Sequence, residues 1–199
     1  MAAGGLRERK AARTRHQIVE AALDLFLTRG FDQTTMEDIA ERAEIGSSTL
    51  YRYFPSKDLV ILEPILGFTE MGDHLRARPE SEPLRVALAE TIRDALVGFV
   101  TDDRLAEVRR IVDATPGPRA KLWDIMMTSR ESLEHAVGER IGVPGDAMTA
   151  VLTARMTMVV YELAAEAWWA GDHDRPVGEV IEEVLAEVQA ASVSVPGLD

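Results

Sequence analysis

The stretch Thr34–Asp58, TTMEDIAERAEIGSSTLYRYFPSKD, contains the pattern that decides the fold. Its first part predicts a short helix, because Thr34 and Glu37 stand at the spacing of a capping box. Apolar residues then recur at helical spacing, at Met36, Ile39, Ala40 and Ala43. We therefore expect one face of this helix to be buried.

A second short helix is expected from Ser47, after a turn at Gly46. It opens with small polar side chains, and Leu50 and Phe54 give it one apolar face. Two short helices around a tight turn are the layout of a helix-turn-helix, whose second helix enters the major groove of DNA with its first residues at the base edges. The alternative is an ordinary helical hairpin of a bundle. Such a hairpin has no need for the polar and aromatic run SSTLYRY.

The pattern extends on both sides of this stretch. Residues 14–30, TRHQIVEAALDLFLTRG, predict a helix with one buried stripe, made by Ile18, Ala21, Ala22, Leu25 and Phe26. Together with the run YRYFPSK at 51–57, these segments resemble the TetR family of one-component transcription regulators. The diagnostic region covers residues 13–60, about a quarter of the chain, and the remaining residues match only in helical character and length.

Two positions depart from the family pattern. The family usually has Gly where this chain has Glu44, and Ser where this chain has Gly46. Glycine takes a positive φ freely, whereas a Glu in that conformation costs on the order of 1 kcal/mol. We therefore expect a reshaped turn, in which Gly46 supplies the unusual backbone and Ser47 replaces the lost N-cap.

The net charge of −12 does not exclude a nucleic-acid partner, because its distribution is uneven. Residues 1–60 carry nine Lys or Arg and nine Asp or Glu, so the thirteen basic and twenty-five acidic residues that follow account for the whole net charge. A basic N-terminal arm on a neutral head, with an acidic body held away from phosphates, is compatible with DNA binding. An ordinary solvated surface explains the acidic body equally well.

The chain contains no Cys, which excludes a disulfide framework and a thiolate nucleophile and fits an intracellular location. No apolar run approaches the length of a membrane span, and residues 1–6 are too short and mixed for a signal peptide. We therefore expect a cytoplasmic protein that does not enter a membrane.

Nearly every segment predicts helix, and no segment shows the alternation of a strand. After residue 55 the expected helices run from 57 into the seventies with a kink at Pro64, and then over 84–101, 105–112, 116–141, 146–171 and 176–191. The predicted fold is all-α with nine helices. A three-helix DNA-binding head with its N-terminal arm occupies residues 1–55, and a six-helix ligand-binding and dimerisation body occupies residues 56–199.

The sequence contains no clear arrangement of catalytic residues. The four histidines are widely spaced, without a metal-ligand or triad companion, and no glycine loop is suited to cradle a phosphate. Asp172, His173 and Asp174 could bind a cation, but three adjacent polar residues in a loop are more often solvated. We expect neither an enzyme, nor a metal, nor a cofactor.

A ligand cavity in the body is the stronger expectation. Methionine and aromatic side chains adapt to irregular apolar shapes and line promiscuous pockets, although for any one of them plain core packing is the alternative. The family resemblance implies an effector site lined by Leu66, Leu88, Ile92, Phe99, Trp123, Met126, Met127, Arg130, Met156 and Tyr161. The segment 109–169 also resembles actinobacterial members near the mycofactocin-type regulator, which implies a small apolar effector such as a long acyl chain or an acyl-CoA.

The last two helices predict an oligomer interface. The helix at 146–171 is apolar on more than one side, so both sides must be covered. Family relatives form a four-helix dimer interface from the corresponding pair, which implies a homodimer through Val151, Val159, Leu163, Val180, Ile181, Val184, Leu185 and Val188.

The resemblance implies a ligand-responsive transcriptional regulator, a repressor on a double-stranded, pseudo-palindromic operator. It assigns DNA contacts to Thr35, Ser47, Ser48, Thr49, Tyr51, Arg52, Tyr53 and Lys57, with the arm of Arg7, Arg9, Lys10 and Arg13 adding phosphate or minor-groove contacts. The competing hypothesis is a helical small-molecule-binding or partner-binding protein whose DNA-binding head is weak or vestigial, and Glu44 is the residue that favours it. An all-α enzyme ranks third.

Overall fold

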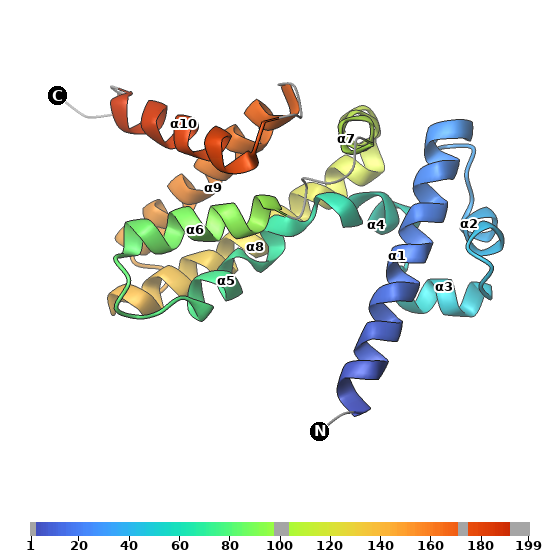
Figure 1. Ribbon diagram of the computed structural model, residues 1–199, viewed down its shortest axis with the longest axis horizontal. Helices are drawn as coiled ribbons and strands as arrows, with labels where there is room; N and C mark the ends of the chain where they lie inside the picture. Colours follow the sequence, from blue (N-terminus) through green and yellow to red (C-terminus); the bar gives the residue numbers. More distant parts are fainter. Residues whose placement is uncertain (1–2, 98–103, 171–174, 192–199) are drawn as a thin grey trace. The chain divides into compact units, whose positions relative to one another are not determined.

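The computed structural model describes residues 3–97, 104–170 and 175–191, and these residues form ten α-helices and two short 3-10 helices, with no strand among them (Figure 1). The all-α prediction is confirmed. In chain order the elements are α1 (Ala3–Arg29), α2 (Met36–Arg42), α3 (Ser47–Tyr53), α4 (Lys57–Leu62), η1 (Glu63–Ile65), η2 (Gly67–Glu70), α5 (Met71–Ala77), α6 (Leu84–Val97), α7 (Leu105–Ala114), α8 (Pro116–Ile141), α9 (Met148–Ala170) and α10 (Val177–Ala190).

The chain packs as two compact units. The first, here called the head unit, comprises Met1–Leu66 and Arg104–Ile125, and the second, the body unit, comprises Gly67–Asp103 and Met126–Asp199. Packing thus adds α4, η1, α7 and the first part of α8 to the three helices predicted as the head. The predicted functional division, with a DNA-binding head at residues 1–55 and a ligand-binding and dimerisation body at residues 56–199, remains a proposal.

The core of the head unit forms as the apolar periodicity predicts. The α1 stripe is buried at all five expected positions, and Phe26 meets Phe31 with ring centroids 5.0 Å apart. α1 packs on α2 and α4, and α7 packs on α4 and η1. Gly117, at the start of α8, lies so close to Asp58 of α4 that an added Cβ would be 3.1 Å from its Oδ1.

The capping box of α2 is shifted by one residue from the prediction. Thr35, not Thr34, is the N-cap: its Oγ1 accepts a hydrogen bond from the Asp38 N–H (3.1 Å), and the Asp38 carboxylate accepts one from the Thr35 N–H (2.8 Å). Thr34 is buried instead and donates its hydroxyl to the Gly30 carbonyl (2.9 Å). The hydrogen bonds from Thr35 lower the pKa of Asp38.

The turn after α2 differs from the expectation at both unusual positions. Glu44 itself takes the left-handed conformation (φ 55°), while Gly46 is extended (φ −71°, ψ 144°) and is the N-cap of α3. The N–H of Glu44 bonds to the Glu41 carbonyl and that of Ile45 to the Ala40 carbonyl, each at 3.0 Å. These two bonds make a complete Schellman motif, so the turn keeps its usual form with a Glu where glycine is preferred.

The helix predicted from Lys57 into the seventies is broken rather than kinked. α4 ends at Leu62, Pro64 lies inside η1, and a second 3-10 helix precedes α5. Proline lacks the N–H of an i to i−4 bond and clashes with the preceding turn, which explains the break. Two α-helices therefore replace one, and the described residues contain ten α-helices instead of the predicted nine.

In the body unit, α10 packs on α9 and α6, and α8 approaches α5 closely at Gly72, where an added Cβ would meet the Ser132 side chain at 2.4 Å. The loop between α5 and α6 is held by Arg140, whose guanidinium donates to the carbonyls of Pro79 (2.6 Å) and Glu82 (2.9 Å). This long side chain from α8 thus donates hydrogen bonds to backbone carbonyls of the polar, proline-containing loop, which have no helical partner.

α9 is more apolar than we expected from the sequence, because we expected no apolar run to approach the length of a membrane span. By length and composition alone it could cross a membrane, since its most apolar window has a mean hydropathy of 1.2. However, 44% of that window is buried within the protein. Its buried side carries the core of the body unit, at Ala150, Ala154, Thr157, Met158, Val160, Tyr161, Ala164, Ala165 and Trp168.

We predict that Glu44→Gly stabilises the protein by up to about 1 kcal/mol, because glycine removes the left-handed strain at this residue while the extra freedom of the unfolded chain offsets part of the gain. Glu44→Ala is the matched control, since it removes the same carboxylate but keeps a Cβ at positive φ. Urea denaturation monitored by circular dichroism measures both. Equal stabilisation by the two variants would show that the carboxylate, and not the backbone conformation, is the source of the cost.

Candidate DNA interface

α3 is held to the head unit by one face and exposes the other. Leu50 and Phe54 are fully buried, so they fix the orientation of this seven-residue helix. The opposite face is exposed and polar or aromatic, with Thr49 and Tyr53 half-buried at its edges and Ser47, Ser48, Tyr51 and Arg52 in solvent. Small hydroxyl groups, a phenol and a guanidinium on one rigid face can reach base edges and phosphates in a major groove.

The two large exposed side chains of α3 are partly positioned already. The Tyr51 hydroxyl donates to the Glu37 carboxylate of α2 at 3.3 Å, and desolvation together with this carboxylate raises the pKa of Tyr51. The Arg52 guanidinium lies 5.6 Å from the centroid of the Tyr53 ring. The Arg52 side chain is thus exposed, while its guanidinium makes a cation–π contact with the neighbouring ring.

Lys57 has a structural role that its position in the motif does not reveal. Its ammonium donates to the carbonyls of Phe31 (2.8 Å) and Thr34 (3.2 Å) and lies 4.4 Å from the centroid of the Phe31 ring. An ammonium has three donors, so one is left for a phosphate. Thr35 is exposed beside this cluster, with its hydroxyl engaged in the capping box.

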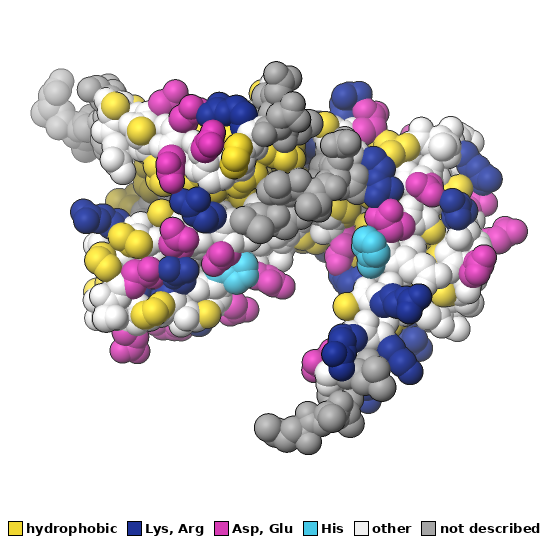
Figure 2. Space-filling view, in the orientation of Figure 1, with side chains coloured by type: hydrophobic (Ala, Val, Ile, Leu, Met, Phe, Trp, Pro, Cys, Tyr) yellow, Lys and Arg dark blue, Asp and Glu magenta, His cyan; other side chains and the backbone are white. Residues whose placement is uncertain are grey.

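The N-terminal arm is the continuation of α1, which begins at Ala3. The basic side chains Arg7, Arg9, Lys10 and Arg13 are all exposed, and Figure 2 shows Lys and Arg side chains gathered around the first turns of this helix. Arg15, the next basic residue, is committed elsewhere: it pairs with Glu63 through Nη2–Oε2 at 2.6 Å and lies 4.5 Å from the centroid of the Phe54 ring. Arg15 therefore supports α3 from behind.

An ionic network missed by the sequence reasoning connects three helices of the head unit. Arg104, at the start of α7, donates to Glu20 at 2.8 Å and lies 3.6 Å from Asp24, both on α1. Asp24 also accepts from Arg42 of α2 at 2.8 Å. Glu20 and Arg104 are 84 positions apart, so no local pattern could have indicated this contact.

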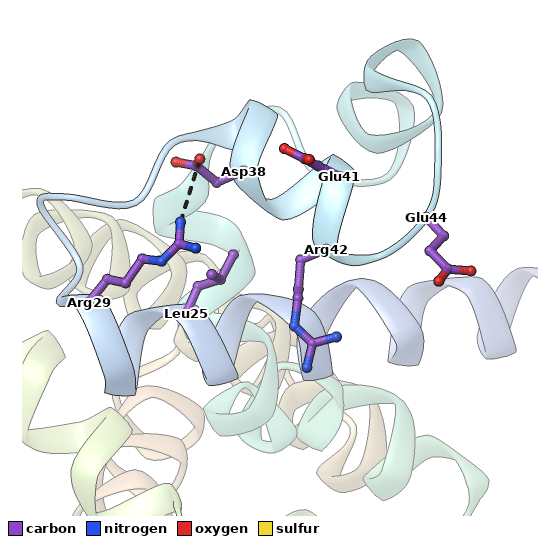
Figure 3. Close-up of a pocket in the computed structure, with 6 residues that line it drawn as sticks. All are labelled: Leu25, Arg29, Asp38, Glu41, Arg42 and Glu44. Atoms are coloured by element: carbon purple, nitrogen blue, oxygen red, sulfur yellow. Dashed lines mark ion pairs between the residues drawn. The ribbon is translucent and has the colours of Figure 1, made fainter.

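Arg42 also lines a hollow of about 360 Å³ between α1 and α2. Its walls mix charges of both signs, with Arg29 and Asp38 facing each other at 3.8 Å (Figure 3). The remaining lining residues are Leu25, Glu41 and Glu44. Opposite charges arranged in this way neutralise each other, so the hollow has no clear preference for an anion or a cation.

The predicted effector residues fall in different places. Leu88, Ile92, Met126, Met127, Arg130 and Tyr161 belong to the body unit and are buried or half-buried. Leu66 and Trp123 belong to the head unit, Trp123 is 58% exposed, and Phe99 lies outside the described residues. Trp123 and Met156 (50% exposed) do not fit the expectation of an enclosed cavity wall, because their helix faces point to solvent.

Nδ1 of His74 on α5 and Oγ1 of Thr91 on α6 are buried in the body unit and have no hydrogen-bond partner among the described residues. The Nε of Arg130 on α8 is also buried, but it lies 3.6 Å from the Glu134 carboxylate, with which it forms an ion pair. Leaving a buried polar atom unpaired costs about 1–3 kcal/mol. No group of three or more His, Asp or Glu in the described ranges is arranged to hold a metal, and residues 172–174 lie outside them.

The predicted dimer residues divide between α9 and α10. Val159 and Leu163 are exposed on α9, and Val151 is half-buried. On α10, by contrast, Val180, Ile181 and Val184 are buried inside their own subunit, while Leu185 and Val188 are half-buried. The narrow apolar stripe of α10 covers α9 and α6 and is not free for a partner, which corrects the expectation for these three residues.

Comparisons with known proteins agree with this geometry. A model of the family "Bacterial regulatory proteins, tetR family" matches residues 18–63. The chain is 36% identical to the transcriptional regulator TcmR of Streptomyces glaucescens over 71% of its own length and 66% of that relative. It is 28% identical to MftR of Mycobacterium tuberculosis, which is named for the regulation of mycofactocin biosynthesis, over 87% of its own length and 88% of MftR.

The fold has a solved counterpart in the transcriptional regulator FadR from Bacillus subtilis, whose structure contains stearoyl-CoA. The TM-score is 0.59 at 20% identity, covering 87% of this chain and 96% of FadR. The matched segment at 18–63 spans the buried stripe of α1, the helix-turn-helix and α4, which are the elements that position the exposed face of α3. The chain belongs to the TetR family of bacterial transcriptional regulators.

Proposed function

We propose that the protein is a homodimeric repressor, which binds a pseudo-palindromic operator in the cytoplasm and leaves it when a small apolar effector binds the body unit. The observation that carries the proposal is α3, a helix anchored by Leu50 and Phe54 whose other face is exposed and bears hydroxyl, phenol and guanidinium groups. The complete turn before α3 argues against a vestigial head, because Glu44 strains the motif without distorting it.

Each part of the interface has its own proposed role. Arg52, together with Ser47, Ser48 and Thr49, faces bases or nearby phosphates, whereas Tyr51, Tyr53, Thr35 and Lys57 contact the DNA backbone. The exposed arm Arg7, Arg9, Lys10 and Arg13 adds phosphate or minor-groove contacts from the first turns of α1.

The proposed effector is apolar with a polar end, such as a fatty acyl group or a long-chain acyl-CoA. The stearoyl-CoA bound by the structurally similar FadR supports this class. The unpaired atoms Nδ1 of His74 and Oγ1 of Thr91 support it independently, since a polar group of a ligand can form the hydrogen bonds that the protein does not provide. Half-buried Met126 and Met127 supply adaptable apolar surface on the same helix as Arg130.

The operator should be pseudo-palindromic. A two-fold dimer presents its recognition helices to half-sites whose centres are about 34–36 Å apart, or a multiple of that distance, so that both lie on the same side of the duplex. Footprinting on the DNA upstream of the gene itself measures this, with a duplex of equal length carrying one half-site as the control. A short asymmetric footprint made by a monomer would contradict the proposal.

Arg52→Ala and Lys57→Ala should have different signatures. Loss of a base contact at Arg52 should cost about 1–3 kcal/mol and relax the preference at one position. Lys57→Ala should weaken all sequences alike, reduce the salt slope by about one and also lower the melting temperature, because the ammonium links two backbone carbonyls. Fluorescence anisotropy over a salt series gives the first two quantities, and Lys57→Arg is the charge-conserving control. Equal, sequence-blind losses would reduce Arg52 to a backbone contact.

Long-chain acyl-CoA should release the operator complex. Release requires that the effector binds the DNA-free state more tightly, usually by about 1–3 kcal/mol, and the coupling is reciprocal, so operator must weaken effector binding by the same factor. Tryptophan fluorescence follows effector binding while anisotropy follows DNA release.

In the same titration, Met127→Arg should abolish the response and spare DNA affinity, because it places a charge on the proposed cavity wall. Thr128→Arg, at the adjacent exposed position of α8, is the control and should still respond. Effector binding that leaves operator affinity unchanged would refute the switch.

A further inference from the structure

The surface that α3 presents to DNA also carries a carboxylate, which comes from α2. Glu37 lies in the first turn of α2, is exposed, and accepts a hydrogen bond from the Tyr51 hydroxyl at 3.3 Å. At about 100° per residue, Tyr51 lies between Ser47 and Ser48 on the exposed face of α3. The Glu37 carboxylate therefore lies at the edge of the face that meets the major groove.

The stability of α2 does not account for this arrangement. Acidic residues in the first turn of a helix stabilise it, but Asp38 already does so, and its carboxylate accepts a hydrogen bond from the Thr35 N–H at 2.8 Å. The Glu37 carboxylate bonds instead to a side chain of the next helix. Desolvation, and after it this carboxylate, raises the pKa of Tyr51, so the phenol keeps its proton and remains a donor.

A carboxylate is selective among the groups that a DNA duplex exposes. When ionised it only accepts hydrogen bonds, and phosphates repel it. Guanine and thymine present acceptors in the major groove, and adenine presents the acceptor N7 beside its amino group. Cytosine presents the N4 amino group as a donor, so cytosine is the base that a carboxylate recognises.

We propose that Glu37 reads a cytosine in each half-site of the operator, with its carboxylate accepting a hydrogen bond from the N4 amino group. This inference rests on the proposed operator and adds a base-reading residue from outside α3. Tyr51 is the positioning residue. A phenol has one O–H group, so the hydroxyl that holds Glu37 does not also donate to a phosphate. The contact of Tyr51 with the DNA backbone is then made by its ring.

The first experiment measures the affinity of the full chain for duplexes in which each position of one operator half-site carries each of the four base pairs. The unaltered protein should prefer cytosine at one position by about 5- to 150-fold. Glu37→Gln should change the preferred base there from cytosine to adenine, because glutamine bonds to both N6 and N7 of adenine.

Glu41→Gln is the matched control for this experiment. It removes the same charge one turn later on α2, where the side chain is also exposed. Because a lost carboxylate reduces repulsion of the phosphates, Glu41→Gln should raise the affinity for all duplexes alike and change no preference. Circular dichroism verifies that the variants are folded.

Two further measurements test the individual atoms. Tyr51→Phe removes only the hydroxyl and should lower the preference for cytosine at this position while leaving the preferences at all other positions unchanged. Replacing the cytosine by pyrimidin-2-one, which lacks only the amino group, should weaken binding of the unaltered protein more than binding of Glu37→Ala, by a factor of about 5 to 150.

The possible failures are distinguishable. If Glu37→Gln and Glu41→Gln raise the affinity for every duplex by the same factor, Glu37 only repels phosphates, and base reading is overturned while operator binding stands. A uniform loss from Tyr51→Phe on all duplexes assigns the hydroxyl to a phosphate and overturns its positioning role. An unaltered protein without preference at any position overturns the proposed operator and this inference together.

Discussion

The burial of Leu50 and Phe54 is the constraint on which the head depends. A helix of seven residues is not stable alone in water, so the order of α3 comes from these two side chains and from the turn before it. Arg15 reinforces the anchor from α1, because its guanidinium lies over the Phe54 ring and pairs with Glu63. The exposed face can therefore be rich in hydroxyls without affecting the stability of the helix that carries it.

Local patterns predicted what local interactions determine. The stripe of α1, the apolar side of α3 and the start of α8 at its prolines follow from periodicity and backbone chemistry alone. The capping box was misplaced by one residue because Thr34 and Thr35 each precede an acidic residue by three positions, and only tertiary burial of Thr34 distinguishes them. At Glu44 the residue type predicted the wrong backbone conformation, because the hydrogen bonds of the turn outweigh the preference of Glu for negative φ.

Contacts between distant positions could not be predicted from the sequence. Nothing near Lys57 indicates that its ammonium bonds to the carbonyls of Phe31 and Thr34, and nothing near Arg104 indicates Glu20. For α9 the apolar composition predicted two covered sides but not which residues lie on each. Met156 was assigned to an effector cavity, whereas its exposure groups it with Leu152 and Val159.

The membership of α7 in the head unit has a consequence for building chimaeric regulators. An exchange of ligand domains at residue 55 would give the new protein a foreign α7, and Glu20 and Asp24 would lose the guanidinium of Arg104. A transferable DNA-binding module therefore consists of two separate segments of the chain, and a functional recombination point must preserve both.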